Sequence, residues 1–315
     1  MRICILGAGA LGSAIGGTLA EAGHEVTLVN RNRGHVDAIC RHGLVLRSDG
    51  HDRVVHLAAV TETAGMAPVD LVVVLVKSPD TEAAVAAARS IVGPDTLVIS
   101  LQNGVGQEEL LASILGRRHV LGGRTYAGGV MLGPGHVLCG VTGKETIIGE
   151  MDGVVTPRAA ALARTLTESG LETHVSAEIR AVIWDKLLVN VATGALAAVT
   201  GLTYGQLYQL PEIEETAVAA VAEAMAVAQA AGIRLATSDP HAPWKKASSG
   251  LPPEFKTSML QSLEKGRRTE IDFINGAVVR EGRRMGVPTP VNATLVALVK
   301  GVETKTGISA QAVAA

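Results

Sequence analysis

A glycine-rich turn near the start of the chain constrains the fold more than any other feature. Gly7, Gly9 and Gly12 have the spacing GxGxxG. An apolar run, Arg2–Leu6, precedes the turn and an alanine-rich stretch, Ser13–Ala22, follows it, so the turn joins a predicted strand to a predicted helix. There, glycines permit a tight turn, close approach to a pyrophosphate and close packing of helix on strand. We predict a dinucleotide-binding Rossmann domain; a glycine-rich turn without a ligand is the alternative. The predicted contacts come from Gly7, Ala8, Gly9, Ala10, Leu11 and Gly12.

The end of the second predicted strand indicates which dinucleotide is bound. Glu25–Asn30 is a second apolar run, and Arg31 follows it directly. Enzymes that bind NAD usually have an acid at this point to hold the ribose 2′-hydroxyl, whereas an arginine suits the 2′-phosphate of NADP. Arg31, with Arg33 close behind, therefore predicts NADP. The alternative is that both arginines are solvated loop charges.

Two further apolar runs predict an open parallel sheet. Asp70–Val76 and Thr96–Leu101 are continuous apolar segments of the kind that helices cover on both faces. Lys77 follows the first run, and Asn103 follows the second after one residue. Ligands of such sheets bind beyond the carboxyl ends of the strands. We therefore expect one crevice at the loops that carry Gly7, Arg31, Lys77 and Asn103.

The rest of the chain predicts more α/β structure and then helices alone. Short glycine-punctuated strands between Val120 and Ile148 are expected to pair antiparallel at the end of the sheet. A helix, Pro157–Glu168, and a strand, Glu172–Val175, precede Ser176, a predicted N-cap that marks the domain boundary. The predicted fold is α/β, with a Rossmann-type doubly wound sheet over residues 1–176 and an all-helical domain over 177–315. The helices of that domain are expected at Ala177–Val199, Glu212–Ala231, Ser258–Glu264, Phe273–Met285 and Asn292–Val302, with a loop at Pro240–Pro253.

Composition and charge narrow the class of function. The formal net charge is -2 and there is no basic stripe, so a nucleic-acid partner is not expected. The three cysteines form no CxxC and no apolar leader precedes the first strand, which together predict a reducing cytoplasm. Apolar runs such as Ala217–Ala231 are interrupted by polar residues, so no membrane span is expected. The nine histidines lack ligand spacing, so no metal is expected either.

The helix after the boundary carries the first chemically suggestive group. In Ile183–Asn190, Lys186 and Asn190 are four residues apart and share one helix face, beside the apolar Leu187 and Leu188. Loss of solvation on such an apolar helix lowers the pKa of a lysine toward neutrality. Lys186 would then donate a proton at pH 7. The alternative is a surface lysine whose ammonium stays in water.

Two more polar residues lie near predicted helix starts. Glu270 begins a helix with an apolar stripe at Ile271, Ile274 and Val278. Its carboxylate is either a first-turn charge that favours the helix dipole or a site residue. Ser258 is either an N-cap or a site residue. These local patterns leave both alternatives open.

In combination, these motifs resemble the ketopantoate reductases, which are 2-dehydropantoate 2-reductases of the 6-phosphogluconate dehydrogenase-like superfamily. The resemblance extends over essentially the whole chain, and its motifs occur in order. An ordered set is far more specific than any single motif. The set comprises Gly7–Gly12, Lys77, Gln102–Gly104, Trp184 with Lys186 and Asn190, Ser258 with Met259, and Thr269–Gly276.

The resemblance implies a role for each of these residues. Lys186 would be the general acid that protonates the carbonyl oxygen of the substrate while NADPH supplies the hydride, and Glu270 would orient Lys186 and hydrogen-bond the reacting hydroxyl. Asn103 would lie between the nicotinamide and the substrate, in a cleft between the domains. Asn190 and Ser258 would hold substrate oxygens. The cofactor-binding set would be Gly7, Ala8, Gly9, Ala10, Leu11, Gly12, Arg31, Lys77, Asn103 and Glu270.

One position departs from the family pattern. The family has a second asparagine four residues after the first, whereas this chain has Gly194. The missing amide would leave one polar group of the substrate without its partner, at a cost of about 1 to 3 kcal/mol. Thr193 is a candidate substitute, although it projects about 100 degrees away around the helix. Gly194 therefore puts the identity of the 2-oxo acid in question, but not the type of reaction.

The sequence thus predicts NADPH-dependent reduction of ketopantoate. The nearest alternative is an enzyme of the same fold that acts on another 2-oxo acid or secondary alcohol. A cofactor-binding regulator without catalysis is the alternative from another class, and the joint presence of Asn103, Lys186, Glu270 and Ser258 argues against it. The alanine-rich helices of the second domain also suggest a homodimer interface.

Overall fold

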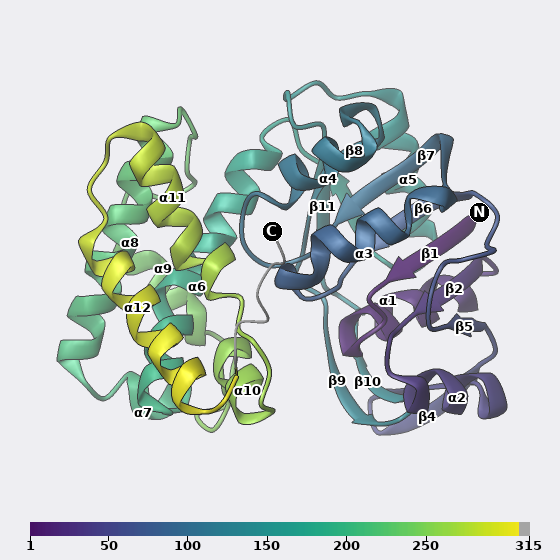
Figure 1. The fold of residues 1–315 in the computed structure, drawn as a ribbon, viewed down its shortest axis with the longest axis horizontal. Helices are drawn as coiled ribbons and strands as arrows, with labels where there is room; N and C mark the ends of the chain where they lie inside the picture. The colour runs from purple at the N-terminus through teal and green to yellow at the C-terminus, as the bar shows by residue number, and fades with distance from the viewer. Residues whose placement is uncertain (309–315) are drawn as a thin grey trace. The chain divides into compact units, whose positions relative to one another are not determined.

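The computed structural model describes residues 1–308, which divide into two compact units (Figure 1). The first unit comprises Met1–Gln102 and Gln107–Ile179. The second comprises the loop Asn103–Gly106 and, of the described residues, 180–308. The predicted α/β class, with a sheet-and-helix domain followed by a helical one, is confirmed. That the loop Asn103–Gly106 joins the helical unit is not evident from the sequence.

An eight-stranded sheet forms the centre of the first unit. Its strand order is β12-β11-β8-β7-β6-β1-β2-β5, and every pair is parallel except β8 with β11. Because β6, β1 and β2 are neighbours and parallel, their carboxyl ends lie at one edge of the sheet. The strands are β1 (Arg2–Leu6), β2 (Glu25–Val29), β5 (Ala58–Val60), β6 (Val69–Val74), β7 (Val92–Ser100), β8 (Val120–Thr125), β11 (Thr146–Gly149) and β12 (Thr173–Val175).

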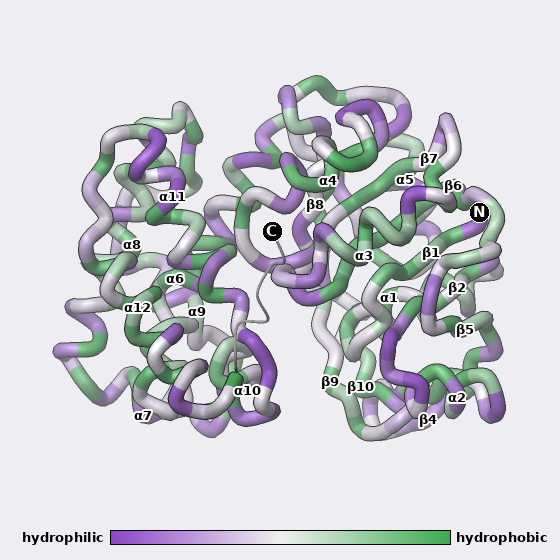
Figure 2. Tube along the Cα trace, in the orientation of Figure 1, coloured by the Kyte–Doolittle hydropathy of each residue, from purple (hydrophilic) through white to green (hydrophobic). Residues whose placement is uncertain are grey.

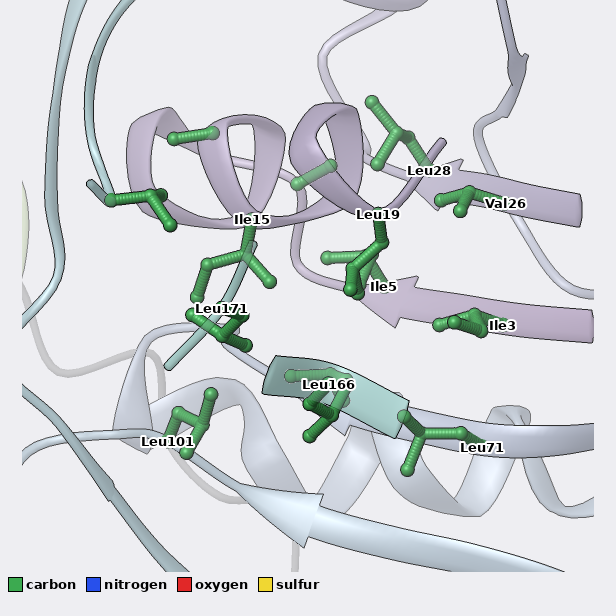
Figure 3. Close-up of a cluster of buried hydrophobic side chains, with 14 of the residues drawn as sticks. Ile3, Ile5, Ile15, Leu19, Val26, Leu28, Leu71, Leu101, Leu166 and Leu171 are labelled. Atoms are coloured by element: carbon green, nitrogen blue, oxygen red, sulfur yellow. The ribbon is translucent and has the colours of Figure 1, made fainter. Parts of the chain in front are cut away.

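Helices cover both faces of this sheet, as a doubly wound fold requires. Side chains of β1 alternate between the faces: Ile3 and Ile5 pack with Ile15 and Leu19 of α1 (Figure 3). Cys4, between them, packs into the cluster on the opposite face. Burial raises the pKa of the Cys4 thiol to about 12, so this cysteine is an inert core residue. The helices are α1 (Ala10–Glu21), α2 (Arg33–His42), α3 (Thr81–Ala87), α4 (Gln107–Leu115) and α5 (Pro157–Glu168), with a short turn η1 (Ser78–Asp80) before α3.

A separate four-stranded sheet corrects one prediction. We expected all the short strands after Val120 at the end of the main sheet, but only β11 pairs antiparallel there, with β8. The hairpin of β9 (Gly128–Gly133) and β10 (His136–Gly140) instead pairs with β3 (Leu44–Ser48) and β4 (His51–Val55). A buried histidine holds the hairpin turn, because the Gly135 N–H donates to Nδ1 of His35 at 3.0 Å.

Two local patterns in this unit mislead. The sequence Gly-Pro-Asp at residues 93–95 predicts a turn but lies inside β7, where the Gly93 N–H donates to the Thr96 hydroxyl. The apolar run over residues 54–57 predicts a strand, but β4 begins earlier, at His51, and β5 over Ala58–Val60 is not predicted at all. Short strands such as β5 depend on pairing with a neighbour, here β2, which local sequence does not encode.

The second unit contains helices and no strand among its described residues. The loop expected over Pro240–Pro253 contains a helix, α9, because Trp244 is buried there and stacks on Tyr208 with ring centroids 4.0 Å apart. The helices are α6 (Ile179–Thr200), α7 (Tyr204–Leu207), α8 (Pro211–Ala230), α9 (His241–Ser248), α10 (Ser258–Glu264), α11 (Asn275–Met285) and α12 (Pro290–Lys305).

Helix α6 carries Lys186 and Asn190 and is rich in apolar residues. Figure 2 shows the hydropathy along this helix and its neighbours. Within the described residues α6 alone is long and apolar enough to cross a membrane, by length and composition. In the most apolar 18-residue stretch of this helix, however, 72% of the residues are buried inside the protein, which is typical of a core helix.

Candidate active site

The glycine turn is fixed by contacts between backbone atoms. Gly7 has φ +103°, and a Cβ there would lie 2.2 Å from the Val76 nitrogen. A Cβ at Gly12 would lie 2.5 Å from the Gly7 carbonyl oxygen, so the helix α1 packs too closely on the turn for any side chain. A Cβ at Gly9, in contrast, would meet nothing within 4 Å. The open space beside Gly9 fits the close approach of a pyrophosphate.

Two side chains, one from α1 and one from the residue after β2, hold the turn through the Ala8 carbonyl. That oxygen accepts from Nδ2 of Asn30 at 2.5 Å and from the Ser13 hydroxyl at 3.2 Å. Ser13 also contacts Nε2 of the buried His35 at 3.1 Å. Because Nδ1 of His35 accepts from Gly135, the neutral ring carries its proton on Nε2 and donates it to Ser13. Burial lowers the pKa of His35, which favours this neutral form.

The predicted 2′-phosphate residues lie at the same edge of the sheet. Arg31 follows β2 and is 80% exposed, and Lys77 follows β6 and precedes η1. Asn30 shapes the Arg31 loop, since its Oδ1 accepts from the Asn32 N–H at 2.9 Å. The Arg31 guanidinium donates to the Asp80 carboxylate at 2.6 Å. Asp80 has no counterpart in the sequence prediction, and no local signal pairs it with a residue 49 positions away.

The predicted substrate residues come together in the helical unit. Nδ2 of Asn190 donates to Oδ1 of Asn103 at 3.5 Å, so the two predicted amides are adjacent. The loop that carries Asn103 also contacts the segment after Glu270: the Val105 N–H donates to the Phe273 carbonyl at 3.2 Å. Gly104 permits this contact, since its φ is +94° and a Cβ there would lie 2.3 Å from the Phe273 oxygen. Asn103 therefore belongs to this unit, although the sequence placed it with Gly7 in the dinucleotide crevice.

Lys186 and Glu270 belong to the same unit. Lys186 is half-buried on α6, one turn before Asn190. Glu270 is 6% exposed and precedes a short 3-10 turn, Ile271–Phe273, but its side chain makes no cap hydrogen bond there. Glu270 thus occupies the N-cap position without a cap hydrogen bond, and both the charge at the helix start and the site role stay predictions. Its neighbour Thr269 is held by the Glu303 carboxylate, which accepts from the Thr269 N–H at 2.7 Å.

Ser258 lies at the start of α10, close to Gly194 of α6, the position where the family has its second asparagine. Ser258 is exposed and is the first residue of the helix, while Thr257 is its N-cap and accepts from the Leu260 N–H at 3.3 Å. Ser258 is thus not the cap. A Cβ at Gly194 would lie 3.4 Å from Cε of Met259, so residue 194 of α6 packs beside the residue next to Ser258.

Thr193 does not replace the missing asparagine. Its side chain is 2% exposed and donates to the Val189 carbonyl at 3.3 Å. It also lies 3.4 Å from the Tyr204 hydroxyl, another buried group of the same unit. The hydroxyl is therefore used within the core of the helical unit.

No group of three or more His, Cys, Asp or Glu side chains in residues 1–308 is arranged to hold a metal ion. The two amides of the candidate site, Asn103 and Asn190, are instead hydrogen-bonded to each other. The arrangement offers proton donors and hydrogen-bond partners to a polar organic substrate.

Comparison with known sequences identifies the family. Residues 3–153 match the family described as ketopantoate reductase PanE/ApbA, and residues 178–303 match its C-terminal domain. The chain belongs to the ketopantoate reductase family. This confirms the resemblance inferred from the motifs and makes the protein an oxidoreductase that uses a pyridine nucleotide.

Relatives and solved structures cover almost the full length of this family member. It is 36% identical over 303 residues to a 2-dehydropantoate 2-reductase of Archaeoglobus fulgidus, covering 96% of this chain and 98% of the relative. A crystal structure of a PanE/ApbA family ketopantoate reductase from Ralstonia eutropha JMP134 superposes with a TM-score of 0.89 at 36% identity, over 98% of this chain and 100% of that one. A ternary structure of D-mandelate dehydrogenase with NADH and anilino(oxo)acetate also reaches 0.89, at 30% identity and the same coverage.

Proposed function

We propose that the protein reduces 2-dehydropantoate, or ketopantoate, to pantoate with NADPH. Curated relatives with this name are 33 to 36% identical over nearly the whole chain. The observation that carries the proposal is the joining of Asn103, Asn190 and the segment after Glu270 in one unit that also contains Lys186. The resemblance assigns Asn190 to the substrate oxygens and Asn103 to the boundary between the nicotinamide and the substrate. It assigns Lys186 to proton transfer.

The glycine turn fits a dinucleotide. Gly7 and Gly12 leave no room for side chains, and the space at Gly9 is open. Ala8, Ala10 and Leu11 complete the turn and the start of α1, whose free N–H groups suit a pyrophosphate. Arg31 and Lys77 would bind the 2′-phosphate, with Asn103 and Glu270 toward the nicotinamide. The nicotinamide, when bound, supplies a hydride to the carbonyl carbon.

The side chains of the helical unit would bind the carbonyl oxygen of the substrate and supply the proton that it takes up. Lys186 donates a proton from Nζ to the carbonyl oxygen as negative charge develops there, which balances the hydride and yields a 2-hydroxy acid. Glu270 accepts a hydrogen bond from the resulting hydroxyl and orients Lys186. Asn190, Asn103 and Ser258 bind the remaining substrate oxygens.

Replacement of Lys186 tests the proposal most directly. In Lys186→Ala, turnover of ketopantoate should fall by about 10² to 10⁴-fold, the range for loss of a general acid, while NADPH still binds. Lys265→Ala, which removes an exposed lysine of the same unit, is the matched control and should be unaffected. The assignment fails if Lys186→Ala turns over at the rate of the control.

A second candidate substrate class follows from Gly194. Position 194 carries no amide and packs against the Met259 side chain, and Thr193 does not substitute for the second family asparagine. The similarity to D-mandelate dehydrogenase, whose structure holds the aryl oxo acid derivative anilino(oxo)acetate, favours a bulkier 2-oxo acid.

Steady-state kinetics in both directions with ketopantoate and a panel of branched and aromatic 2-oxo acids would separate the two substrates. Gly194→Asn should raise kcat/KM for ketopantoate by about five- to 100-fold, the equivalent of one buried hydrogen bond. Gly194→Ala adds only a Cβ and serves as the control. A wild-type preference for ketopantoate together with no gain in Gly194→Asn would remove the second candidate.

Two broader expectations stay predictions. Cys4, Cys40 and Cys139 are free thiols, which fits a reducing compartment such as the cytoplasm. A homodimer through the helical unit is a further prediction, which analytical ultracentrifugation of the full chain would test.

A further inference from the structure

An ion pair joins the two loops that flank the glycine turn. Arg31 follows β2 and Asp80 ends the turn η1 after β6, and β1 lies between these two strands. The Arg31 guanidinium and the Asp80 carboxylate are 2.6 Å apart. The pair therefore connects the loops that follow β2 and β6, the two strands on either side of β1, which leads into Gly7.

The Arg31 guanidinium in this ion pair is the group that is predicted to bind the 2′-phosphate of NADP. An arginine after the second strand distinguishes NADP from NAD because it binds the 2′-phosphate. In this chain the guanidinium is already bound to a carboxylate. A phosphate that binds Arg31 must displace Asp80 or share the guanidinium with it, and two anions on one guanidinium repel each other.

Asp80 also lies close in the chain to Lys77, the second predicted cofactor-binding cation of this site. Asp80 lies within one turn of Lys77, since the Asp80 N–H donates to the Lys77 carbonyl at 2.8 Å. Asp80 is thus bound to Arg31 by its carboxylate and to Lys77 by its backbone, and both cations are predicted to bind the cofactor. An acid beside the ribose is also the feature by which NAD enzymes hold the 2′-hydroxyl.

We propose that Asp80 determines cofactor specificity by holding Arg31 in an ion pair that the 2′-phosphate of NADP must displace and that NAD leaves intact. The inference rests on the proposed function, because it concerns the same nucleotide site. Asp80 weakens NADP binding and leaves NAD binding unchanged, so the wild-type enzyme distinguishes the two cofactors less than Arg31 alone would allow.

The test is equilibrium binding of nucleotides to the full chain by calorimetry. The probes are NADP⁺, NAD⁺, and the fragments 2′,5′-ADP and 5′-AMP, which differ by the 2′-phosphate. In Asp80→Asn, NADP⁺ and 2′,5′-ADP should bind about three- to tenfold more tightly, from the loss of an exposed ion pair and of like-charge repulsion. NAD⁺ and 5′-AMP should change by less than about twofold.

Two further variants make the test specific. Asp52→Asn removes the same charge from another exposed ion pair, with Arg47 on the second sheet, and should leave all four affinities unchanged. Arg31→Ala should weaken NADP⁺ binding, and adding Asp80→Asn to it should give less than half of the gain seen in the wild-type background, since Asp80 acts mainly through Arg31.

The outcomes separate this inference from the proposed function. If the wild-type protein binds neither dinucleotide, the proposed function is wrong and the inference is wrong with it. If the wild type binds NADP⁺ but Asp80→Asn does not tighten it, or tightens NAD⁺ equally, the inference alone is wrong. A full gain that persists in the Arg31→Ala background also contradicts it.

Discussion

The glycine turn of the first unit and the buried amide network around Asn292 in the helical unit are built in different ways. At Gly7 and Gly12 backbone atoms lie so close that a Cβ would be within 2.5 Å of a neighbour. In the helical unit the corresponding precision comes from side chains, such as Asn292, which joins α8, α11 and α12 by hydrogen bonds. A site built on backbone sterics tolerates no side chain, whereas a site built on amides depends on each partner being present.

The largest effect is expected at Gly7. Gly7→Ala places a Cβ 2.2 Å from the Val76 nitrogen in a backbone with φ +103°, so the turn must shift. We expect the free energy of unfolding to fall by about 3 kcal/mol or more, measured by urea denaturation.

Gly9→Ala is the matched control for this steric argument. Nothing lies within 4 Å of a Cβ there, and its φ of -72° suits any residue, so stability should change by less than about 0.5 kcal/mol. Binding of NADP⁺ should nevertheless weaken by about tenfold or more, since the new methyl occupies the space for the pyrophosphate. Equal stability of the Gly7 and Gly9 variants would contradict the contrast.

A smaller effect is expected from the amide network. In the buried Asn292, Oδ1 accepts from Asn275 at 3.0 Å, and Nδ2 donates to the Ala220 carbonyl and to Glu223 at 2.9 and 2.8 Å. Asn292→Ala removes these three bonds, although Glu223 still accepts from the backbone N–H groups of residues 291 and 292. The variant should destabilise the protein by about 2 to 3 kcal/mol. Thr294→Ala, at an exposed position of the same helix, should cost less than about 0.5 kcal/mol. A cost in Asn292→Ala no larger than that control would show that the network is not needed for stability.

The same contrast explains how much of the fold could be predicted. The start of the helix Pro157–Glu168 is predictable from local signals, because Thr156 caps it and Pro157 is its first residue. The pairing of β10 with β3 was missed because it joins residues about ninety positions apart. Helix α9 was missed because burial of Trp244 against Tyr208 overrides a proline- and serine-rich segment.

The residues of the candidate site also differ in whether local sequence predicts them. The glycine turn and Arg31 follow from spacing, since each has a local reason to be there. Local patterns left Lys186 and Glu270 with alternatives, and only the ordered resemblance to a family selected them. Asp80 and Glu303 were not predicted at all, because their partners Arg31 and Thr269 are distant in sequence. Long-range polar pairs require the folded chain.

The smallest predicted effect concerns protonation of His35, which links α2 to the glycine turn. Burial lowers its pKa in the folded protein below the ordinary value of 6.5, so the unfolded chain takes up the proton first as pH falls. Stability is therefore fully present above about pH 6.5 and decreases below it. His35→Gln can keep the bonds to Ser13 and Gly135 without a charge, so its unfolding free energy should depend less on pH between 7 and 5.

Nucleotide binding distinguishes His35 from a general effect of histidine titration. His24 also has a lowered pKa, from burial and from the N-terminal ammonium, but its ring contacts Ser169 and not the turn. Protonated His35 cannot accept a hydrogen bond from the Gly135 N–H. Its loss disturbs the series of hydrogen bonds that runs from His35 through Ser13 to the Ala8 carbonyl. NADP⁺ affinity should therefore fall with pH more steeply in the wild type and His24→Gln than in His35→Gln. Titration of the nucleotide phosphate is common to all three proteins and cancels. Parallel binding curves would show that the glycine turn is held by its backbone alone.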